Sequence, residues 1–482
     1  MFANTTYLLK LSKFSSRNTV SFSTPIHREM QVHFIAIGGS VMHNLAIALH
    51  HKGYKVSGSD DEIYDPAQSR LQSLGLLPAE MGWFPKKIHA DLDAVIVGMH
   101  ARKDNPELAR AIELGLPVYS YPEYIYQQSL HKQRVVIAGS HGKTTITSMI
   151  LHVLRYNNRL FDYLVGAQLE GFDTMVKLTD NAPTIIIEGD EYPASPTDAN
   201  PKFLHYHPHI ALISGIAWDH YNVFPTWEVY VDQFEKLAES LPKSGILIFD
   251  ETDDMLDVIG KNERVDVRPV PYEAHAHRIV NGQTFLSTAD YGDVPLLVFG
   301  EHNMKNISGA LAVCTELGLT HAQFYRAIQT FKGAANRMET LAKNDKTAAF
   351  KDFAHAPSKV EATTKAAKSQ FPKRILVACV ELHTFSSLNK DFIGQYAHKL
   401  DAADIAAVYY NPHTLMHKRL AAIEPAEVQA AFQRKDLHVF TDHKALQAFL
   451  LDQKWTDANL LMMSSGTFGG LNLKELAAEI VQ

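Results

Sequence analysis

The sequence has very little cysteine, no long apolar run and no excess of basic residues. Its two cysteines, Cys314 and Cys379, cannot form a disulfide framework, and such scarcity is typical of proteins of the reducing cytoplasm. No apolar run approaches the roughly 18 residues that a membrane-spanning helix needs, so we expect no membrane insertion. The net charge of −7 argues against nucleic acid as a partner. These absences leave a cytoplasmic globular protein.

Length and composition then set the number of domains. Of the 482 residues, 46% are hydrophobic and 21% are charged, which is the composition of an ordinary globular protein. Domains of roughly 150 residues make three the natural number for such a chain. Residues 1–29 are rich in Ser, Thr and Asn. We interpret them as a disordered leader or a mis-assigned start rather than a transit peptide, because Met30 directly precedes the first expected strand.

Apolar runs alternate with helix-like segments along the whole chain, which is typical of βαβ units and parallel sheets. The expected strands are 32–37, 55–58, 94–97, 116–119, 135–138, 184–188, 210–214, 245–249, 348–353, 374–380, 405–409, 438–440 and 459–464. Residues 265–299 are rich in Pro, Gly, Val and Thr and indicate short antiparallel strands. We therefore predict an α/β protein of three domains, each on a mostly parallel sheet: N-terminal Rossmann-like, central P-loop ATPase-like and C-terminal Rossmann-like.

The stretch 139–145 is the most informative motif. It links an expected strand to a segment with helical spacing, so backbone N–H groups and a helix dipole point at one anionic site. Lys143 is expected to reach the terminal phosphates of ATP, and Thr144 to hold magnesium. The loop is a shortened variant, GxxGKTT, because Ile137 stands where the common P-loop has its first glycine. The expected ATP-binding residues here are Gly139, Ser140, His141, Gly142, Lys143, Thr144 and Thr145.

Acidic residues follow the next expected strand. Glu188 adjoins three isoleucines, and Asp190 and Glu191 come just after it. Ligands of an open α/β sheet bind at the carboxyl ends of its strands, where a carboxylate can hold the magnesium of ATP. His220 follows the strand beyond and is a candidate ligand of a second metal, although most histidines in such a chain are structural. The expected catalytic residues are Lys143, Glu188 and His220, and the expected metal ligands are Thr144, Glu188 and His220.

Further polar residues stand at helix starts and strand ends in the second half of the chain. His302, Asn303 and Asn306 open a helix, where they either cap it or contact the adenine and polar groups of ATP. Arg337 lies just beyond the Gly333 linker and is suited to phosphates, and Asp352 follows a strand and is suited to a ribose hydroxyl. Each of these residues taken alone is better explained by a structural role than by a functional one.

The first expected strand ends in Gly38, Gly39 and Ser40, and Asp60 ends the next strand about 20 residues on. The loop is similar to a dinucleotide-binding turn, but Ala36 replaces its first glycine. Binding of a nucleotide diphosphate is therefore favoured over binding of NAD. These four residues are the candidates for contact with a nucleotide-linked sugar.

Five motifs, in this order, resemble the Mur ligases, ATP-dependent amide-forming enzymes of peptidoglycan synthesis. They are GxxGKTT, EGDE at 188–191, WDH at 218–220, GEHN at 300–303 and DFAHAP at 352–357. The resemblance implies a UDP-sugar-binding domain at 30–130, a central ATP-binding domain at 131–335, and a domain at 336–482 that binds ATP and the amine substrate. It also implies ATP and Mg²⁺ as cofactors and an acyl phosphate intermediate.

Within this family the resemblance favours the recycling branch, which joins UDP-N-acetylmuramate to L-alanyl-γ-D-glutamyl-meso-diaminopimelate. The segments 191–206 and 464–470 carry this likeness, and Ser464, Ser465 and Phe468 are the expected amine-substrate residues. No lysine stands in register in the helix after the WDH motif, where several Mur ligases carry a carbamoylated lysine. The block 381–386 and Ala356 depart from the family pattern and leave the amine substrate open.

Other functions remain as alternatives. A UDP-N-acetylmuramate–L-alanine ligase uses the same carboxylate with a smaller amine. A P-loop ATPase that drives a conformational switch would hydrolyse ATP without an acceptor, and the acidic strand end and the nucleotide-like first domain disfavour it. A folate polyglutamate ligase shares the central fold but lacks this first domain. We expect a monomer or weak oligomer.

Overall fold

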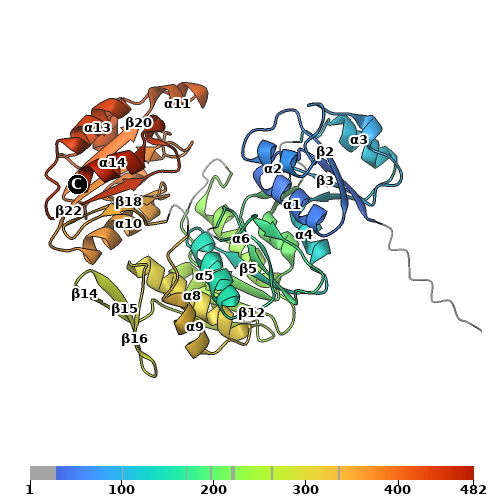
Figure 1. Cartoon of the computed structure of the whole chain (residues 1–482), viewed down its shortest axis with the longest axis horizontal. Coiled ribbons are helices and arrows are strands. Elements are labelled where there is room, and N and C mark those ends of the chain that lie inside the picture. The colour runs from blue at the N-terminus through green and yellow to red at the C-terminus, as the bar shows by residue number, and fades with distance from the viewer. Residues whose placement is uncertain are drawn as a thin grey trace, which may run out of the picture.

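The protein was analysed as a computed structural model that describes residues 29–482, apart from His100, Glu170 and the segments 196–197, 219–222, 262–263 and 335–336. Three α/β domains follow one another along an extended molecule, with the central domain between the other two (Figure 1). Three main sheets, each parallel apart from edge strands, confirm the predicted fold class. Among the described residues, no helix combines the length and the apolar character needed to cross a bilayer.

The N-terminal sheet has four parallel strands in the order β2-β1-β3-β4. Helix α1 connects β1 to β2 and helix α3 connects β3 to β4, as in other doubly wound sheets. The strands are β1 (Gln31–Ile35), β2 (Lys55–Ser59), β3 (Ala94–Val97) and β4 (Val118–Ser120), and the helices are α1 (Ser40–His51), α2 (Ala67–Ser73), α3 (Pro106–Glu113) and α4 (Tyr121–Gln128). Its loops at the carboxyl ends of β1 to β4 share one edge.

The central sheet has seven strands in the order β13-β12-β11-β5-β8-β6-β7. The middle strand β5 is apolar and fully buried from Val135 to Ala138, which explains why it lies at the centre. The strands are β5 (Gln133–Ala138), β6 (Asp162–Leu164), β7 (Val176–Lys177), β8 (Thr184–Glu188), β11 (Ile210–Ile213), β12 (Ile246–Asp250) and β13 (Arg268–Tyr272). The helices that cover it are α5 (Lys143–Tyr156), α6 (Trp227–Glu239), α7 (Asp254–Gly260), α8 (Glu301–Glu316) and α9 (His321–Ile328).

One expectation for this region was wrong in part. The segment 265–299 was expected to form only antiparallel strands, but its first strand, β13, pairs in parallel with β12 at the edge of the central sheet. Pro269 and Pro271 are tolerated there because an edge strand needs ladder hydrogen bonds on one side only. The remaining strands, β14 (His277–Val280), β15 (Gln283–Thr288) and β16 (Gly292–Pro295), form the expected antiparallel sheet.

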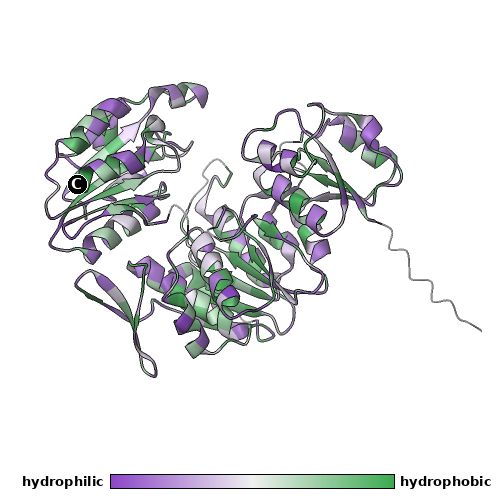
Figure 2. Cartoon of the chain, viewed as in Figure 1, coloured by the Kyte–Doolittle hydropathy of each residue, from purple (hydrophilic) through white to green (hydrophobic). Residues whose placement is uncertain are grey.

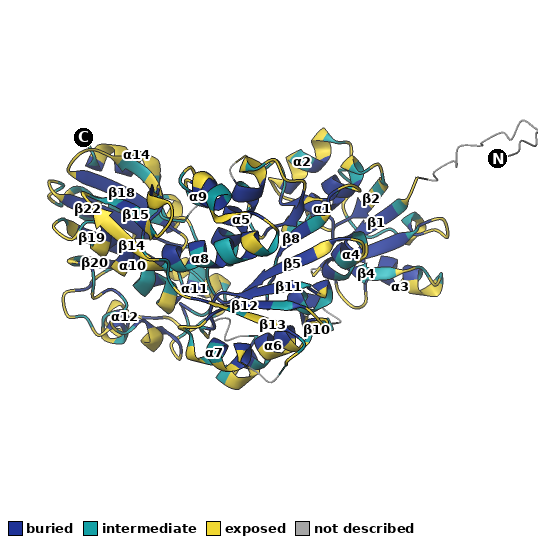
Figure 3. Cartoon of the chain, turned by 90° about the horizontal axis from the view of Figure 1, so that it is seen from below, coloured by how far each residue is buried: buried dark blue, intermediate teal, exposed yellow. Residues whose placement is uncertain are grey.

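The C-terminal sheet has six strands in the order β17-β18-β22-β19-β20-β21, and only the edge strand β17 is antiparallel. Its strands are β17 (Glu339–Lys343), β18 (Thr347–Asp352), β19 (Ile375–Leu382), β20 (Ile405–Tyr410), β21 (His438–Phe440) and β22 (Ala458–Met463). The helices are α10 (Pro357–Gln370), α11 (Pro412–His417), α12 (Pro425–Phe432), α13 (His443–Leu451) and α14 (Leu473–Ile480). Apolar residues line the inner strands of all three sheets (Figure 2), and these inner strands are buried whereas edge strands are partly exposed (Figure 3).

Short strands escaped the sequence analysis. They are β6, β7 and β17, and the hairpin of β9 (Pro193–Ser195) and β10 (Asp198–Pro201), which the 3₁₀ turn at Lys202–Tyr206 follows. Strands of two to five residues carry too few positions for a period-2 pattern to stand out. The β9–β10 hairpin reaches back toward the N-terminal domain and bears on the site described below.

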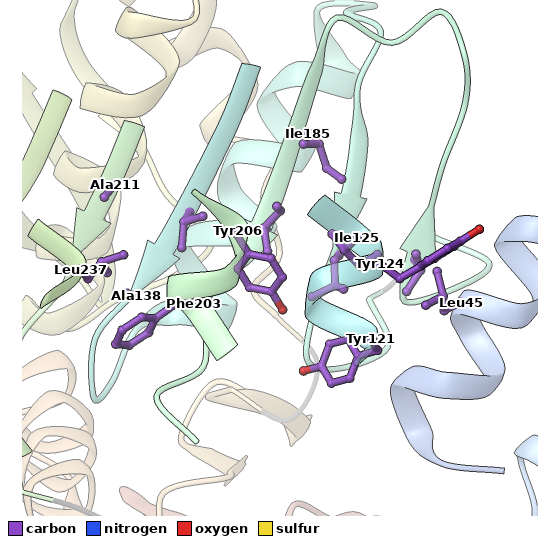
Figure 4. Packing of buried hydrophobic residues seen from close by; sticks show 14 of the residues in the cluster. Leu45, Tyr121, Tyr124, Ile125, Ala138, Ile185, Phe203, Tyr206, Ala211 and Leu237 are labelled. Carbon is purple, nitrogen blue, oxygen red and sulfur yellow. The ribbon is translucent and has the colours of Figure 1, made fainter. Parts of the chain in front are cut away.

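The N-terminal domain is joined to the central domain through one continuous apolar cluster. Helix α4 stands between α1, which carries Leu45, and the segment that carries Tyr206, with Tyr121, Tyr124 and Ile125 on its sides (Figure 4). Polar contacts add to this packing: Asn44 Oδ1 accepts from the backbone N–H of Met175 at 2.9 Å and from Arg70 at 3.2 Å. The two domains are therefore held as one unit.

Asn44→Ala should weaken this junction, because it leaves the buried N–H of Met175 without its acceptor. We expect the free energy of unfolding to fall by about 1–3 kcal/mol. Urea denaturation followed by circular dichroism measures the change. The comparison is Arg70→Ala, which removes a more exposed partner of Asn44 together with exposed bonds to Gln168 and the carbonyl oxygen of Asp173, and should cost less than about 1 kcal/mol. Equal losses in the two variants would contradict this account.

Candidate functional site

The loop between β5 and α5 can be built only with glycine at two positions. Gly139 and Gly142 have φ angles of 126° and 82°, which side-chain-bearing residues rarely adopt. A Cβ atom at Gly142 would lie 2.5 Å from Oδ1 of Asn306, and one at Gly139 would collide with Ser214. The loop is therefore closely packed between α8 and β11. Its compactness leaves the N-terminus of α5 facing the carboxyl edge of the sheet, as the motif predicted.

Lys143, the first residue of α5, is held by two acceptors. Its Nζ lies 2.7 Å from Oε2 of Glu191 and donates to the carbonyl oxygen of Gly139 at 2.5 Å. The side chain of Glu191 is fully buried, and that of Lys143 is 15% exposed. Burial acts to lower the pKa of Lys143, but the carboxylates of Glu191 and Asp190 outweigh it and raise the pKa. Lys143 is therefore an ammonium ion that its two acceptors hold at the carboxyl edge of the central sheet.

A second carboxylate meets the hydroxyl of the next residue. The register of β5 with β8 pairs Ile137 with Glu188, and the Thr144 hydroxyl donates to Oε1 of Glu188 at 2.8 Å. The backbone N–H of Gly166 donates to Oε2 of Glu188 at 2.9 Å. A hydroxyl and a carboxylate are the hard oxygen ligands that Mg²⁺ prefers, so this pair fits a magnesium ion that also contacts phosphate. Among the described residues, no group of three or more acidic, His or Cys side chains could hold a metal.

His220, expected as a second metal ligand, lies outside the described residues. The strand before it, β11, ends beside β5, at the same sheet edge as the P-loop. Ser214 and Gly215 follow β11 directly and contact the loop: the hydroxyl of Ser214 donates to the carbonyl oxygen of Ala138 at 3.2 Å. The N–H of Ser140 donates to the carbonyl oxygen of Gly215 at 2.9 Å.

Tyr230 of α6 supports the site, and the sequence analysis did not find it. Its hydroxyl lies 2.8 Å from the hydroxyl of Ser140 and donates to Oε1 of Glu191 at 3.3 Å. The N–H of Ala217 donates to the hydroxyl of Ser140 at 2.8 Å. Ser140 is therefore a structural residue that connects the loop, α6 and the strand end after β11. The sequence drew attention to the segment around Tyr230 only because it lacks a lysine.

His141 is half-buried beside Gly215. Burial is the largest cause that lowers its pKa to about 4, and the positive charges of Lys359 and Lys143 contribute. Its Nδ1 atom is buried without a hydrogen-bond partner among the described residues. The imidazole is therefore neutral near neutral pH, and one of the two lysines that act on it belongs to the C-terminal domain.

Helix α8 brings three further candidates to the loop. Asn306 touches Gly142, and its Nδ2 donates to Oδ1 of Asn303 at 3.3 Å. Asn303 in turn donates to the carbonyl oxygen of Phe299 at 2.8 Å, so its amide is used within the helix start. His302 is half-buried, and desolvation lowers its pKa although the charge of Asp352 acts against this. His302 and Asp352 approach each other from the central and C-terminal domains.

The C-terminal candidates near this boundary are engaged by their own domain. The carboxylate of Asp352 accepts from the N–H groups of Met338 and Ala354, each at 2.7 Å. The guanidinium of Arg337 lies 4.8 Å from the ring centre of Phe353. The structure thus brings Asp352 and Arg337 to the start of α10, beside the central domain, with Asp352 fixed by backbone donors.

In the N-terminal domain, Asp60 closes the glycine loop. Its Oδ2 accepts from the N–H of Gly38 at 2.7 Å, and burial raises its pKa. Gly39 precedes α1, and the Ser40 hydroxyl lies 3.7 Å from the sulfur of Met175 in the central domain. A residue of the same domain therefore holds the loop in place, and the N-terminus of α1 is available to an anion.

A cleft of about 230 Å³ opens at the carboxyl ends of β3 and β4. Its polar lining comes from Arg102, Lys103, Ser120 and Glu123 of the N-terminal domain and from Ser195 and Asp198 of the β9–β10 hairpin. The sequence analysis missed it because Arg102 and Lys103 form an ordinary charged pair in the sequence, and the hairpin that completes the cleft is more than ninety residues away.

The expected amine-binding loop surrounds a buried carboxylate. Glu381 at the end of β19 accepts from the Ser464 hydroxyl and from the N–H of Phe468, the latter at 2.8 Å. The Phe468 side chain lies in the domain core, 1% exposed, so it cannot face a ligand in this conformation. The Ser465 hydroxyl is buried without a partner among the described residues, and His383 lies 3.8 Å from Glu381. The block that departs from the family pattern therefore fixes this loop.

Comparison with known proteins matches all three domains. The family models "Mur ligase family, catalytic domain", "Mur ligase middle domain" and "Mur ligase, glutamate ligase domain" match residues 31–133, 137–314 and 336–466. A UDP-N-acetylmuramate–L-alanine ligase of Sulfurihydrogenibium sp. is 31% identical over 78% of this chain and 82% of its own. A UDP-N-acetylmuramate–L-alanyl-γ-D-glutamyl-meso-2,6-diaminoheptandioate ligase of Haemophilus influenzae is 28% identical over 92% of this chain and 98% of its own.

Solved structures agree on the fold. A murein peptide ligase from Psychrobacter arcticus has a TM-score of 0.60 at 22% identity, and covers 94% of this chain and 99% of its own. A UDP-N-acetylmuramate–alanine ligase from Thermotoga maritima has a TM-score of 0.67 at 20% identity with the same coverage. With the curated relatives and the family models, these similarities show that the chain belongs to the Mur ligase family.

Proposed function

We propose that this chain joins the carboxylate of UDP-N-acetylmuramate to the amine of L-alanyl-γ-D-glutamyl-meso-diaminopimelate at the expense of ATP, in the cytoplasm. The observation that supports the proposal is the share of each chain that aligns with its relatives. The relatives named as tripeptide ligases align over 92% and 93% of this chain and 98% of their own length. The alanine ligases reach 30–32% identity but align over 77–79% of the chain. The alanine ligase activity remains the alternative.

ATP is assigned to the central domain and the start of the C-terminal domain. The proposed phosphate contacts are the loop Gly139–Thr145 and the start of α5, with Lys143 at the terminal phosphates. Asn306, His302 and Asn303 on one side, and Arg337 and Asp352 on the other, are the proposed contacts to the rest of the nucleotide. A magnesium ion bound by Thr144 and Glu188 would offset the repulsion between the phosphates and the substrate carboxylate, and His220 remains the proposed ligand of a second ion.

The reaction requires two anions and one amine to meet at this edge. A carboxylate oxygen of the muramoyl group forms a bond to the γ-phosphorus while the bond to the β–γ bridging oxygen breaks, and ADP leaves. The amine nitrogen then attacks the acyl carbon, loses a proton, and phosphate departs as the amide forms. Lys143 stabilises charge on the transferred phosphoryl group. Holding the carboxylate, the phosphate and the amine together can lower the activation free energy by ~7–11 kcal/mol. This is the larger contribution, ahead of the charge stabilisation by Lys143.

The nucleotide sugar is assigned to the N-terminal domain. The start of α1 at Gly39 and Ser40 offers backbone N–H groups to a diphosphate, and Gly38 holds the loop through its N–H bond to Asp60. The cleft at the ends of β3 and β4 adds Arg102 and Lys103 beside the acidic Glu123 and Asp198 at the same sheet edge. The hairpin lines this cleft and Ser40 meets Met175, so both places border the central domain, toward which the muramoyl end of the sugar can extend.

An acceptor comparison tests the proposal and its alternatives. We expect phosphate release only when ATP, UDP-N-acetylmuramate and the tripeptide are all present, with a product whose mass is that of the amide. L-Alanine, the dipeptide and the tripeptide should be compared at equal concentration by phosphate assay and mass spectrometry. Turnover with L-alanine equal to that with tripeptide would instead identify an alanine ligase. Hydrolysis without any acceptor would identify an ATPase of another class.

Lys143→Ala should abolish ligation while leaving affinity for UDP-N-acetylmuramate unchanged, because the two sites lie in different domains. Isothermal titration of the sugar nucleotide and the coupled phosphate assay measure both properties. The matched control is Lys261→Ala, which removes an exposed lysine at the C-cap of α7 that pairs with Asp257 of the same helix. Ligation that survives the loss of Lys143 would rule out the proposed ATP site.

Glu191→Gln should lower the stability of the empty protein by about 1–3 kcal/mol, because the buried ammonium of Lys143 loses its carboxylate. Mg-ADP or an ATP analogue should then raise the melting temperature more in the variant than in the wild type, since phosphate replaces the missing negative charge. Differential scanning fluorimetry with and without nucleotide measures this. A smaller nucleotide effect in the variant would show that Lys143 does not exchange Glu191 for phosphate.

A further inference from the structure

One face of helix α10 in the C-terminal domain is docked on the central domain. Ala366 lies against Gly300, the residue before α8, where an added Cβ would come within 2.6 Å of the Ala366 Cβ. One turn later, Gln370 donates to the carbonyl oxygen of Gly282 at 2.6 Å and accepts from the Thr284 hydroxyl at 3.0 Å. Both partners of Gln370 belong to the β14–β15 hairpin. In Figure 1, α10 lies at the lower edge of the C-terminal domain, next to the central domain, where it contacts α8.

Lys359 lies on this same face. It is the third residue of α10, and Ala366 and Gln370 follow it by about two and three helical turns, so all three share one side of the helix. The helix begins five residues after Asp352, at the carboxyl end of β18. Docking by Ala366 and Gln370 therefore directs the N-terminal turn of α10 toward the start of α8 and the P-loop.

The charge of Lys359 is felt inside the P-loop. After burial, it is the largest of the charges that lower the pKa of His141, ahead of Lys143. His141 stands two residues before Lys143, whose ammonium is assigned to the terminal phosphates. The docked face of α10 and the P-loop thus each bring one lysine to the boundary between the central and C-terminal domains.

We propose that Lys359 contributes a second positive charge, from the C-terminal domain, to the terminal phosphates of the ATP that Lys143 binds. The inference rests on the ATP site proposed above and extends it across the domain boundary. The backbone N–H groups at the start of α10 add to the same attraction for an anion. A triphosphate is then held from two domains, and ADP, which lacks the γ-phosphate, is held mainly by one.

The same helix provides matched controls. Lys365 and Lys368 lie on other faces of α10 and pair with residues of their own domain. Lys365 lies 2.6 Å from Glu361, and Lys368 lies 2.6 Å from Asp404. Substituting either should leave the P-loop unaffected, although it removes the same charge from the same helix. Lys365 is the better control because its side chain is 65% exposed.

The experiment compares Lys359→Met, Lys359→Gln, Lys359→Arg and Lys365→Met in the full chain. We expect both neutral substitutions at 359 to raise the KM for ATP on the order of tenfold. The affinity for a non-hydrolysable ATP analogue should fall more than the affinity for ADP, and the KM for UDP-N-acetylmuramate should not change. Lys359→Arg should restore most of the ATP affinity, and Lys365→Met should match the wild type.

An unchanged KM for ATP in both neutral variants would overturn the inference, as would an equal loss in Lys365→Met. Equal losses for ADP and the ATP analogue would place Lys359 away from the γ-phosphate and also overturn it. Failure of the wild-type protein to bind any adenine nucleotide would sink the proposed function itself. Two neutral variants are used because a local disturbance caused by methionine at the helix start would not be shared by Lys359→Gln.

Discussion

The register between β5 and β8 is the constraint on which the candidate site depends. It pairs Ile137 with Glu188, so one carboxylate ends beside the hydroxyl of Thr144 and a second, Glu191, beside the ammonium of Lys143. A shift of the register by one residue would turn Glu188 to the opposite face of the sheet. Because the loop already pairs its own charges, binding a triphosphate exchanges partners within a preformed site rather than ordering a new one.

The three domains are attached with unequal strength. The N-terminal and central domains share one apolar cluster through α1 and α4, whereas the C-terminal domain builds clusters of its own, to which the central domain contributes Phe299. Phe299 packs against Phe350 and Phe371, and along α10 Ala366 and Gln370 contact two glycines and a threonine of the central domain. Relative motion is the usual expectation for domains of one chain unless their interface is large and hydrophobic. The C-terminal domain is therefore the one suited to open and close during a reaction cycle.

The sequence predicted what depends on local pattern. Buried strands such as Val135–Ala138 and Ile185–Ile187 are continuous apolar runs, and the P-loop is a contiguous motif, so both could be placed without a structure. Residues that matter through tertiary contact could not. Tyr230 is an ordinary helix residue until α6 brings it to Ser140 and Glu191, and Glu381 gains its role only when β22 places Ser464 beside it. Phe468 was expected at a ligand, but its aromatic side chain fills the core instead.

Electrostatics connects the nucleotide to the position of the C-terminal domain. The docked α10 brings the charge of Lys359 near enough to the P-loop to act on His141, whose neutral imidazole cannot compensate it. Lys143 is already paired with Glu191, so a further positive charge at this point is favoured most when an anion faces both lysines. A bound triphosphate supplies that anion and so favours the docked position of α10. A ligand shifts a conformational equilibrium only by its difference in affinity for the two states. The γ-phosphate supplies such a difference, so we expect ATP to favour the docked domain and its conversion to ADP to release it.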